Sequence, residues 1–335
     1  MYLCNAEQFL YMETLQAFDH IRLNFSPQGL QALNIALAFV MFGVALEIKL
    51  DHFKKLLLNP KSAFVGVFSQ FLVLPFLTFV LAVLLRDVIT PTIALGMILV
   101  AACPGGNVSN FISSLAKGNV ALSVSLTAIA TLAAVFMTPL NFALWGNLYT
   151  RFLVHHAHAA QLVRPLHIDT IQMFRTVFLI LGIPLIVGIF VNSQWPDFAK
   201  KITKSFKRFS ILLFVVIVVI AFAKNFQHFL VVIKYIFLIV LVHNALALAS
   251  GYYVAKIFKR PIVDRRTISI ETGIQNSGLA LVLIFNPRIF PPDLELGGMA
   301  IIAAWWGIWH IVAGLTLAGM WNKPHFDLRH LFKGR

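Results

Sequence analysis

The sequence predicts an all-α polytopic membrane protein, and three observations lead to that fold class. Hydrophobic residues make up 59% of the 335 residues, charged residues only 12%, and the mean hydropathy is +0.83. A soluble globule of this size carries far more charge. The apolar residues also fall into runs long enough to cross a bilayer, and two of these runs are interrupted by polar residues near their middle. We therefore expect the functional residues at the two interruptions.

Nine apolar stretches qualify as membrane-spanning helices, since a spanning helix needs about 20 predominantly apolar residues. The third stretch is broken by Pro104-Gly105-Gly106, and the eighth by the polar run from Glu271 to Gly278. A Pro-Gly-Gly break at membrane depth frees backbone groups that protein or a water-filled cavity must satisfy. The predicted spans are 29–49, 61–86, 91–117, 119–149, 169–192, 208–224, 226–256, 264–286 and 298–320.

The basic residues indicate how the spans are oriented, because Lys and Arg accumulate in cytoplasmic loops. Most of the 27 basic residues fall in alternate loops, on one side of the membrane. This places the amino terminus outside and the carboxy terminus in the cytoplasm. Residues 1–28 form an amino-terminal tail, interpreted as an amphipathic segment and not a signal peptide, and residues 321–335 form a cytoplasmic tail. The net charge of +14 thus reflects topology and does not indicate nucleic-acid binding.

The two interrupted helices occupy equivalent places in two similar units, 61–149 and 226–320. Each unit has a long helix spotted with polar residues, then a broken helix, then a helix with polar residues at mid-depth. The third helix runs inward and the eighth outward, so the second unit is inverted. Inverted repeats with paired discontinuous helices are the signature of many secondary transporters.

Each break is predicted to bind ions. A helix broken at mid-membrane leaves free amides at the start of its second half and free carbonyls at the end of its first half. We expect amides at Asn107 and Asn276 to face an anion, and carbonyls near Cys103 and at 272–274 to face a cation. The surrounding side chains are hard oxygen donors, which suit Na⁺.

Glu271 is the one acid of 13 near the middle of a predicted span. A carboxylate there costs at least ~2.5 kcal/mol on insertion scales, which makes it a functional-site hypothesis. Ser123 and Thr127 share a helix face, and Ser109 and Asn110 follow the first break closely enough to reach the same point. A single Ser or Thr in a membrane helix more often bonds its own backbone or a neighbouring helix. Their grouping around a break favours a ligand role.

The sequence shows no nucleophile–base arrangement, phosphate loop or dinucleotide fingerprint, which argues against an enzyme. Its polar residues are gathered at the two breaks, whereas a passive channel needs a continuous polar stripe. Gln70 and His310 lie at a depth from which they can reach the site. The residues alone leave open whether these two are ligands or make packing hydrogen bonds.

Two stretches, CPGGNVSNFISSLAKGNVALSVSLT at 103–127 and ETGIQNSGLA at 271–280, resemble the bile acid:sodium symporter family, in particular its bacterial-type members. LAFVMFGVALEIKL, SQFLVLP, LVHNALA and IWHIVAG follow in the family's order, so the resemblance covers most of the chain. It implies one transporter unit, 29–320, in which a core domain with two crossed discontinuous helices moves against a panel domain. The implied core is 61–149 and 226–320, and the implied panel is 29–49, 169–192 and 208–224.

The resemblance also implies two sodium sites and a substrate site. The implied first sodium site comprises Ser109, Asn110, Ser123, Thr127 and Glu271. The implied second site comprises Gln70, Glu271, Gln275 and the backbone carbonyls of Thr272 and Ile274. Asn107, Asn276, Ser277 and His310 are expected to contact the substrate. Two residues, Asn107 and Ile311, depart from the Thr and Asn that are common in bacterial relatives, so the resemblance does not fix the substrate.

Charge balance agrees with the transport of an anion. Two Na⁺ ions against one carboxylate leave a local charge of about +1, which is costly in a low-dielectric setting unless a monoanion neutralises it. We expect a symporter that moves bile acid, pantoate or another small carboxylate with two Na⁺ by alternating access. Proton-coupled transport is the alternative, and a passive channel is less favoured. The expected partners are the organic anion, sodium ions and the lipid bilayer, and we expect a monomer in the bacterial inner membrane.

Overall fold

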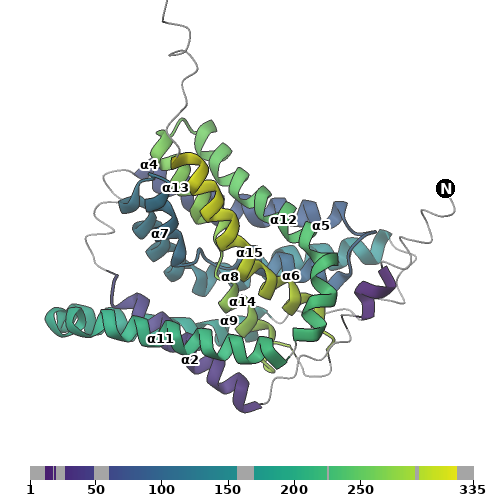
Figure 1. The fold of residues 1–335 in the computed structure, drawn as a ribbon, viewed down its shortest axis with the longest axis horizontal. Helices are drawn as coiled ribbons and strands as arrows, with labels where there is room; N and C mark the ends of the chain where they lie inside the picture. The colour runs from purple at the N-terminus through teal and green to yellow at the C-terminus, as the bar shows by residue number, and fades with distance from the viewer. Residues whose placement is uncertain are drawn as a thin grey trace, which may run out of the picture.

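The computed structural model describes residues 12–17, 19, 27–48, 60–156, 170–224, 226–290 and 294–322, and every regular element in these ranges is helical (Figure 1). The α-helices are α2 (Pro27–Ala45), α4 (Pro60–Phe68), α5 (Leu74–Leu84), α6 (Pro91–Ala102), α7 (Val108–Leu115), α8 (Val120–His156), α9 (Thr170–Val177), α10 (Ile183–Gln194), α11 (Pro196–Lys224), α12 (Phe226–Ile257), α13 (Ile262–Gly273), α14 (Ser277–Ile284) and α15 (Gly297–Asn322). Two π-helical turns, η1 (Ser69–Val73) and η2 (Phe178–Gly182), join α4 to α5 and α9 to α10. The predicted all-α class is confirmed.

Each of the nine predicted stretches contains helix in its described part. Within the described residues, five helical segments are long and apolar enough to cross a membrane. They are Pro60–Leu84, Val120–His155, Thr170–Gln194, Ile233–Ile257 and Gly297–Asn322. Both predicted interruptions are present, between α6 and α7 and between α13 and α14. The four half-helices have 12, 8, 12 and 8 residues, so each alone is too short to span a bilayer.

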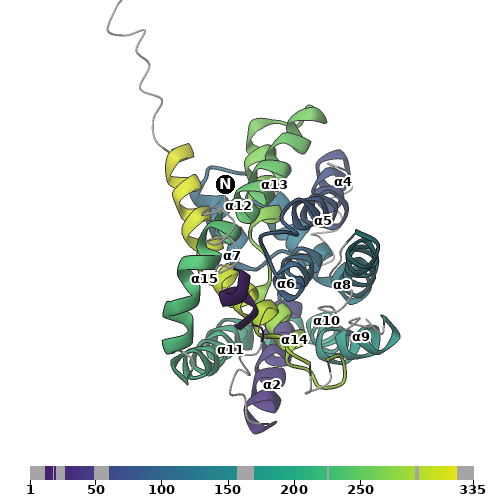
Figure 2. The ribbon, with the colours of Figure 1, turned by 90° about the vertical axis from the view of Figure 1, so that its right-hand side faces the viewer.

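The helices pack in two groups. In the smaller group, α2 lies against α10 and α11 along one side of the molecule (Figure 1). The larger group contains α4 to α8 and α12 to α15, with α6 at its centre between α5, α8 and α15 (Figure 2). Residues 93–102 of α6 are all buried. A Cβ on Gly96 would lie 2.7 Å from the Cα of Met299, so glycine permits the close approach of α6 and α15.

Both π-helical turns come directly before a proline in the second position of the next helix, Pro75 after η1 and Pro184 after η2. Proline has no N–H to donate and its ring clashes with the preceding turn, so the helix widens there. Gln70 lies in η1 and is buried. The spans 61–86 and 169–192 were predicted as continuous helices, so these turns were not expected from the sequence.

Part of the predicted amino-terminal tail packs on the larger group. Residues 12–17 are helical, and Leu15 is fully buried. The Asp19 carboxylate accepts hydrogen bonds from the hydroxyls of Thr90, at 3.2 Å, and Thr92. Thr90 caps α6, where a negative charge is favoured by the helix dipole. These contacts fasten the segment to the start of α6.

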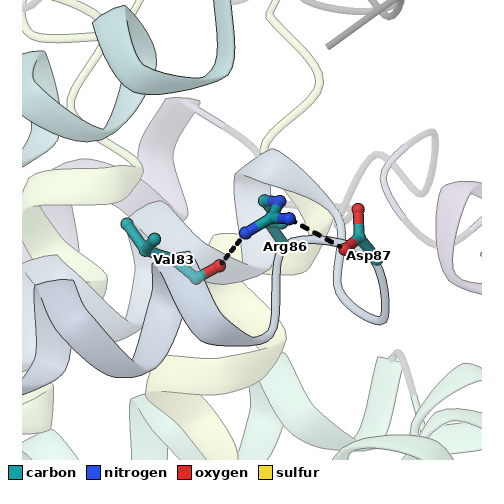
Figure 3. A network of polar contacts seen from close by, with 3 residues as sticks. All are labelled: Val83, Arg86 and Asp87. Carbon is teal, nitrogen blue, oxygen red and sulfur yellow. Dashed lines mark hydrogen bonds and ion pairs between the residues drawn. The ribbon is translucent and has the colours of Figure 1, made fainter. Parts of the chain in front are cut away.

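The end of α5 carries the polar contacts drawn in Figure 3. Arg86 donates to the Val83 carbonyl at 3.4 Å and pairs with Asp87 at 3.5 Å. The two charged side chains are 41% and 70% exposed, so the ion pair contributes little to stability. The Arg86 guanidinium also lies 5.8 Å from the centre of the Phe152 ring, which links the ends of α5 and α8.

Candidate functional site

The two helix breaks lie against each other. The Gly106 N–H donates to the Ile274 carbonyl at 2.7 Å, and the Asn276 N–H donates to the Pro104 carbonyl at 2.8 Å. Gly105 pairs with Gln275 in an antiparallel bridge. Segments 104–106 and 274–276 therefore satisfy each other's backbone groups, as buried backbone outside a helix requires.

This pairing corrects one expectation about the backbone. The Asn276 amide was predicted to face an anion, but it donates to Pro104 because the two breaks are adjacent. The Ile274 carbonyl, a predicted cation ligand, accepts from Gly106 and keeps one lone pair for another partner. The Asn276 side chain caps α14, accepting from the Leu279 N–H at 3.0 Å.

Glu271 is buried on α13, and three hydroxyls surround its carboxylate. Ser109 of α7 donates to Oε1 at 2.7 Å, and Ser123 of α8 donates to the same oxygen. Thr127, one turn further along α8, contacts Oε2 at 3.1 Å. All three hydroxyl residues are buried. Ser123 and Thr127, which the sequence predicts on one helix face, thus both contact the acid.

Asn110 completes this group, which we call the first oxygen cluster: Ser109, Asn110, Ser123, Thr127 and Glu271. The Asn110 Oδ1 lies 2.9 Å from the Ser123 Oγ and 3.2 Å from the Thr127 Oγ1. The Ser109 and Thr127 hydroxyls are 3.4 Å apart. Each hydroxyl has a single proton, so several of these close oxygen pairs have no proton between them. A hard cation bound among the oxygens would remove that repulsion.

Gln70 and Gln275 form a second group with backbone carbonyls. The Gln70 Nε2 donates to the Gln275 Oε1 at 2.8 Å and to the Cys103 carbonyl at 2.9 Å. The Gln275 Nε2 donates to the Thr272 carbonyl at 2.6 Å and to the Gln70 Oε1 at 3.2 Å. We call Gln70, Gln275 and the carbonyls of Cys103 and Thr272 the second oxygen cluster. In this structure each of its oxygens accepts a hydrogen bond from a glutamine amide of the same cluster.

Gly105 lies between the two oxygen clusters, against Glu271 and Gln275, and was not among the predicted ligand residues. A Cβ at this position would lie 3.1 Å from the Glu271 Oε2 and 3.7 Å from the Ile274 carbonyl. The glycine therefore lets the backbone approach the carboxylate closely. Ser113 and Ser69 were also missed. They contact Ser123 at 3.3 Å and Thr272 at 3.1 Å.

The predicted substrate residues lie around the crossing. Asn107 precedes α7, is partly buried, and its side chain makes no capping hydrogen bond. Ser277 begins α14, with its Oγ 2.6 Å from where a Cβ on Gly307 of α15 would stand. His310 follows one turn later on α15. It is buried, and its Nδ1 has no hydrogen-bond partner within the described residues.

Comparison with known sequences places this geometry in a family. A sequence model described as the Sodium Bile acid symporter family matches residues 34–231, which include the first break and the hydroxyls of α8. The chain belongs to the sodium bile acid symporter family. Membership in this family makes the chain a membrane transporter and not an enzyme.

Individual members of the sodium bile acid symporter family align along most of the chain. The "Uncharacterized sodium-dependent transporter YocS" of Bacillus subtilis is 31% identical over 294 residues, which cover 87% of this chain and 83% of that protein. The "Ileal sodium/bile acid cotransporter" of Oryctolagus cuniculus is 30% identical over 286 residues, 83% of this chain and 78% of the relative. The "Probable sodium/metabolite cotransporter BASS1, chloroplastic" of Arabidopsis thaliana is 29% identical over 289 residues. These cover 86% of this chain and 66% of that protein.

Proposed function

We propose that the protein is a sodium-coupled symporter of an organic anion. The observation that carries this proposal is the position of Glu271, a buried carboxylate where two broken helices cross, with hydroxyls from α7 and α8 directed at it. A buried carboxylate without a compensating cation is costly. The names of three relatives, a sodium-dependent transporter and two sodium cotransporters, support sodium as that cation.

We propose that the chain crosses the membrane nine times, with each broken pair counting as one crossing. The amino terminus then lies outside and the carboxy terminus in the cytoplasm, in the bacterial inner membrane. The larger helix group, with its two broken helices, would be the core domain. The group of α2, α9 to α10 and α11 would be the panel domain. The same order of a long, a broken and a long helix in 61–149 and 226–320 supports two repeats, of which the second would be inverted in the membrane.

The first sodium site is proposed at the first oxygen cluster. Its ligand oxygens would be the hydroxyls of Ser109, Ser123 and Thr127, the Asn110 amide oxygen and the Glu271 carboxylate. Each hydroxyl would turn its proton away and direct a lone pair at the ion. Glu271 supplies the negative charge, so sodium binding there needs no other anion.

A second sodium site is proposed at the second oxygen cluster together with Glu271. If the two glutamine carboxamides rotate, their oxygens join the carbonyls of Thr272 and Ile274 in facing the ion. With both sites filled, two positive charges stand against one carboxylate. The surplus positive charge would strengthen binding of a monoanionic substrate, which gives coupling a physical cause.

The substrate is proposed to be a bile acid or a small carboxylate such as pantoate, bound by Asn107, Asn276, Ser277 and His310. These residues flank the crossing, so the anion would lie beside the sodium ions and the α7 amino terminus. Movement of the core against the panel would then expose the loaded site to each side in turn.

The test of this function is uptake of radiolabelled taurocholate or pantoate into proteoliposomes under imposed ion gradients. We expect accumulation when Na⁺ is higher outside, and none when choline replaces it. Accumulation driven by a pH gradient in Na⁺-free buffer would support the proton-coupled alternative instead. Equilibration without accumulation would support a passive channel.

A further inference from the structure

Asp264 is a buried acid that lies outside both oxygen clusters. It stands in the first turn of α13, seven residues before Glu271, and is 6% exposed. Its Oδ2 accepts from the Ser62 hydroxyl of α4 at 2.6 Å, and its Oδ1 accepts from the Asn119 Nδ2 at 2.8 Å. One carboxylate thus joins α4, the start of α8 and α13 at one end of the helices.

Asn119 fastens α8 to α13 through its backbone N–H and carbonyl and its side-chain Nδ2. Its N–H donates to the Val263 carbonyl at 3.2 Å, and its own carbonyl accepts from the Thr267 hydroxyl at 3.2 Å. Its Oδ1 caps α8 by accepting from the Leu122 N–H at 3.1 Å. Its Nδ2 donates to Asp264, so both polar atoms of the Asn119 side chain are hydrogen-bonded.

The joint, by which we mean Asp264 with Ser62 and Asn119, and the first oxygen cluster depend on the same alignment of α8 with α13. Asn119 and Asp264 are 145 positions apart in the chain, and Thr127 and Glu271 are 144 apart. The nearly constant offset means that α8 and α13 run side by side in the same direction. Since each residue advances a helix by 1.5 Å, a slip of a single position would remove Glu271 from its hydroxyls.

The second oxygen cluster depends on the same joint through α4. Ser62 and Asp264 are 202 positions apart, Ser69 and Thr272 are 203 apart, and Gln70 and Gln275 are 205 apart. The Asp264 Oδ2 therefore sets the register of α13 on α4, and its Oδ1 sets the register of α13 on α8. The Oδ2 contact thus affects the second oxygen cluster, and the Oδ1 contact affects the first.

We propose that Asp264 is a positioning residue for both sodium sites, holding the ligands of α4, α8 and α13 in register from a distance. The inference rests on the proposed sodium sites. A cation site tolerates displacements of only about 0.5 Å in its ligands. Residues that orient metal ligands typically affect metal affinity about 10- to 100-fold when they are replaced.

The proposal is tested by the sodium concentration that gives half-maximal thermal stabilisation of the purified full-length protein, measured without substrate. We expect Asp264→Ala to raise that concentration about tenfold. Asp264→Asn should restore most of the affinity, because its amide accepts from Asn119 and donates to Ser62. The matched control is Ser250→Ala, which removes a buried hydroxyl whose one hydrogen bond among the described residues is to Ala247 of its own helix α12. It should leave the sodium response unchanged.

Two milder variants remove the Asn119 contact and the Ser62 contact of Asp264 one at a time. They keep the proposal testable if Asp264→Ala does not fold. Asn119→Ser keeps a capping hydroxyl but loses the group that reaches Asp264. Its effect on sodium affinity should largely vanish when Thr127→Ala has already damaged the first cluster. The effect of Ser62→Ala should vanish in a Gln70→Ala background. Additive effects in both double-mutant cycles would overturn the proposal, because a purely structural role does not couple to a particular site.

The outcomes also separate this proposal from the proposed function. A wild-type sodium response that Glu271→Gln abolishes but Asp264→Ala leaves unchanged overturns the positioning role alone. If the wild-type protein shows no sodium response, the sodium sites themselves are wrong, and the role of Asp264 is overturned with them.

Discussion

The Ser109 hydroxyl of α7 donates to the Glu271 Oε1 of α13 at 2.7 Å, although 162 positions separate the two residues in the chain. The contact exists because both helices are interrupted and the interruptions bond to each other through Gly106 and Ile274. One crossing therefore satisfies the freed backbone and brings a carboxylate to a ring of hydroxyls. We expect the transport chemistry to depend on this arrangement.

The hydroxyls of α8 should determine sodium affinity. Ser123→Ala and Thr127→Ala each remove one oxygen from the first oxygen cluster, so each should raise the sodium concentration for half-maximal substrate binding by roughly tenfold. Thr316→Val serves as the control, because that exposed hydroxyl bonds only to Val312 of its own helix. An unchanged sodium dependence in both α8 variants would place these hydroxyls in helix packing.

Gly105→Ala should disrupt the site without altering any proposed ligand. The added methyl would lie 3.1 Å from the Glu271 Oε2, so the carboxylate has to move. We expect a loss of roughly 1–3 kcal/mol in unfolding free energy and a sodium response weakened at least tenfold. Gly319→Ala is the matched control, since a Cβ there meets nothing within 4 Å. If the two variants have the same sodium response, the close approach at Gly105 does not matter for binding.

Gln70→Ala tests the number of sodium sites. The substitution removes the side chain that links the Cys103 carbonyl to Gln275 and leaves the first oxygen cluster intact. If two ions bind, the Hill coefficient for sodium in uptake should fall from near two to about one. A coefficient that is the same in the variant and the wild type would argue against a second ion at this position.

Asn107 should influence substrate choice. It stands at the first break with no capping bond, and it departs from the Thr that the family resemblance leads us to expect there. We expect Asn107→Thr to change which organic acid gives the largest thermal stabilisation in Na⁺, while the sodium response without substrate stays the same. An identical ranking of acids in both proteins would place substrate recognition elsewhere.

Much of the site followed from local sequence rules. Spacing placed Ser123 and Thr127 on one face, and the breaks marked where Glu271 and Ser109 meet. The antiparallel pairing at Gly105 and Gln275 did not follow, because it depends on how two segments distant in the chain are placed. For this reason the backbone amide of Asn276 was predicted to be free, whereas in the structure it donates to the Pro104 carbonyl.

Asp264 shows a different limit of sequence reasoning. It precedes Arg265 and Arg266 at the start of a predicted span, which is typical of a solvated helix end, so it was expected among the acids of loops and helix ends and not at a buried position. Its burial depends on Ser62 and Asn119 from two other helices. A partner that tertiary packing supplies leaves no periodic signal in the chain.

The most direct test of the central claim is sodium-driven uptake by Glu271→Gln in proteoliposomes, beside the wild-type protein. Glutamine keeps the size of the side chain and its capacity to accept from Ser109 and Ser123, but it removes the charge that we propose binds sodium. We predict that the variant folds, elutes as the wild type does on gel filtration, and shows no uptake driven by a sodium gradient. Full sodium-dependent uptake by Glu271→Gln would contradict the account.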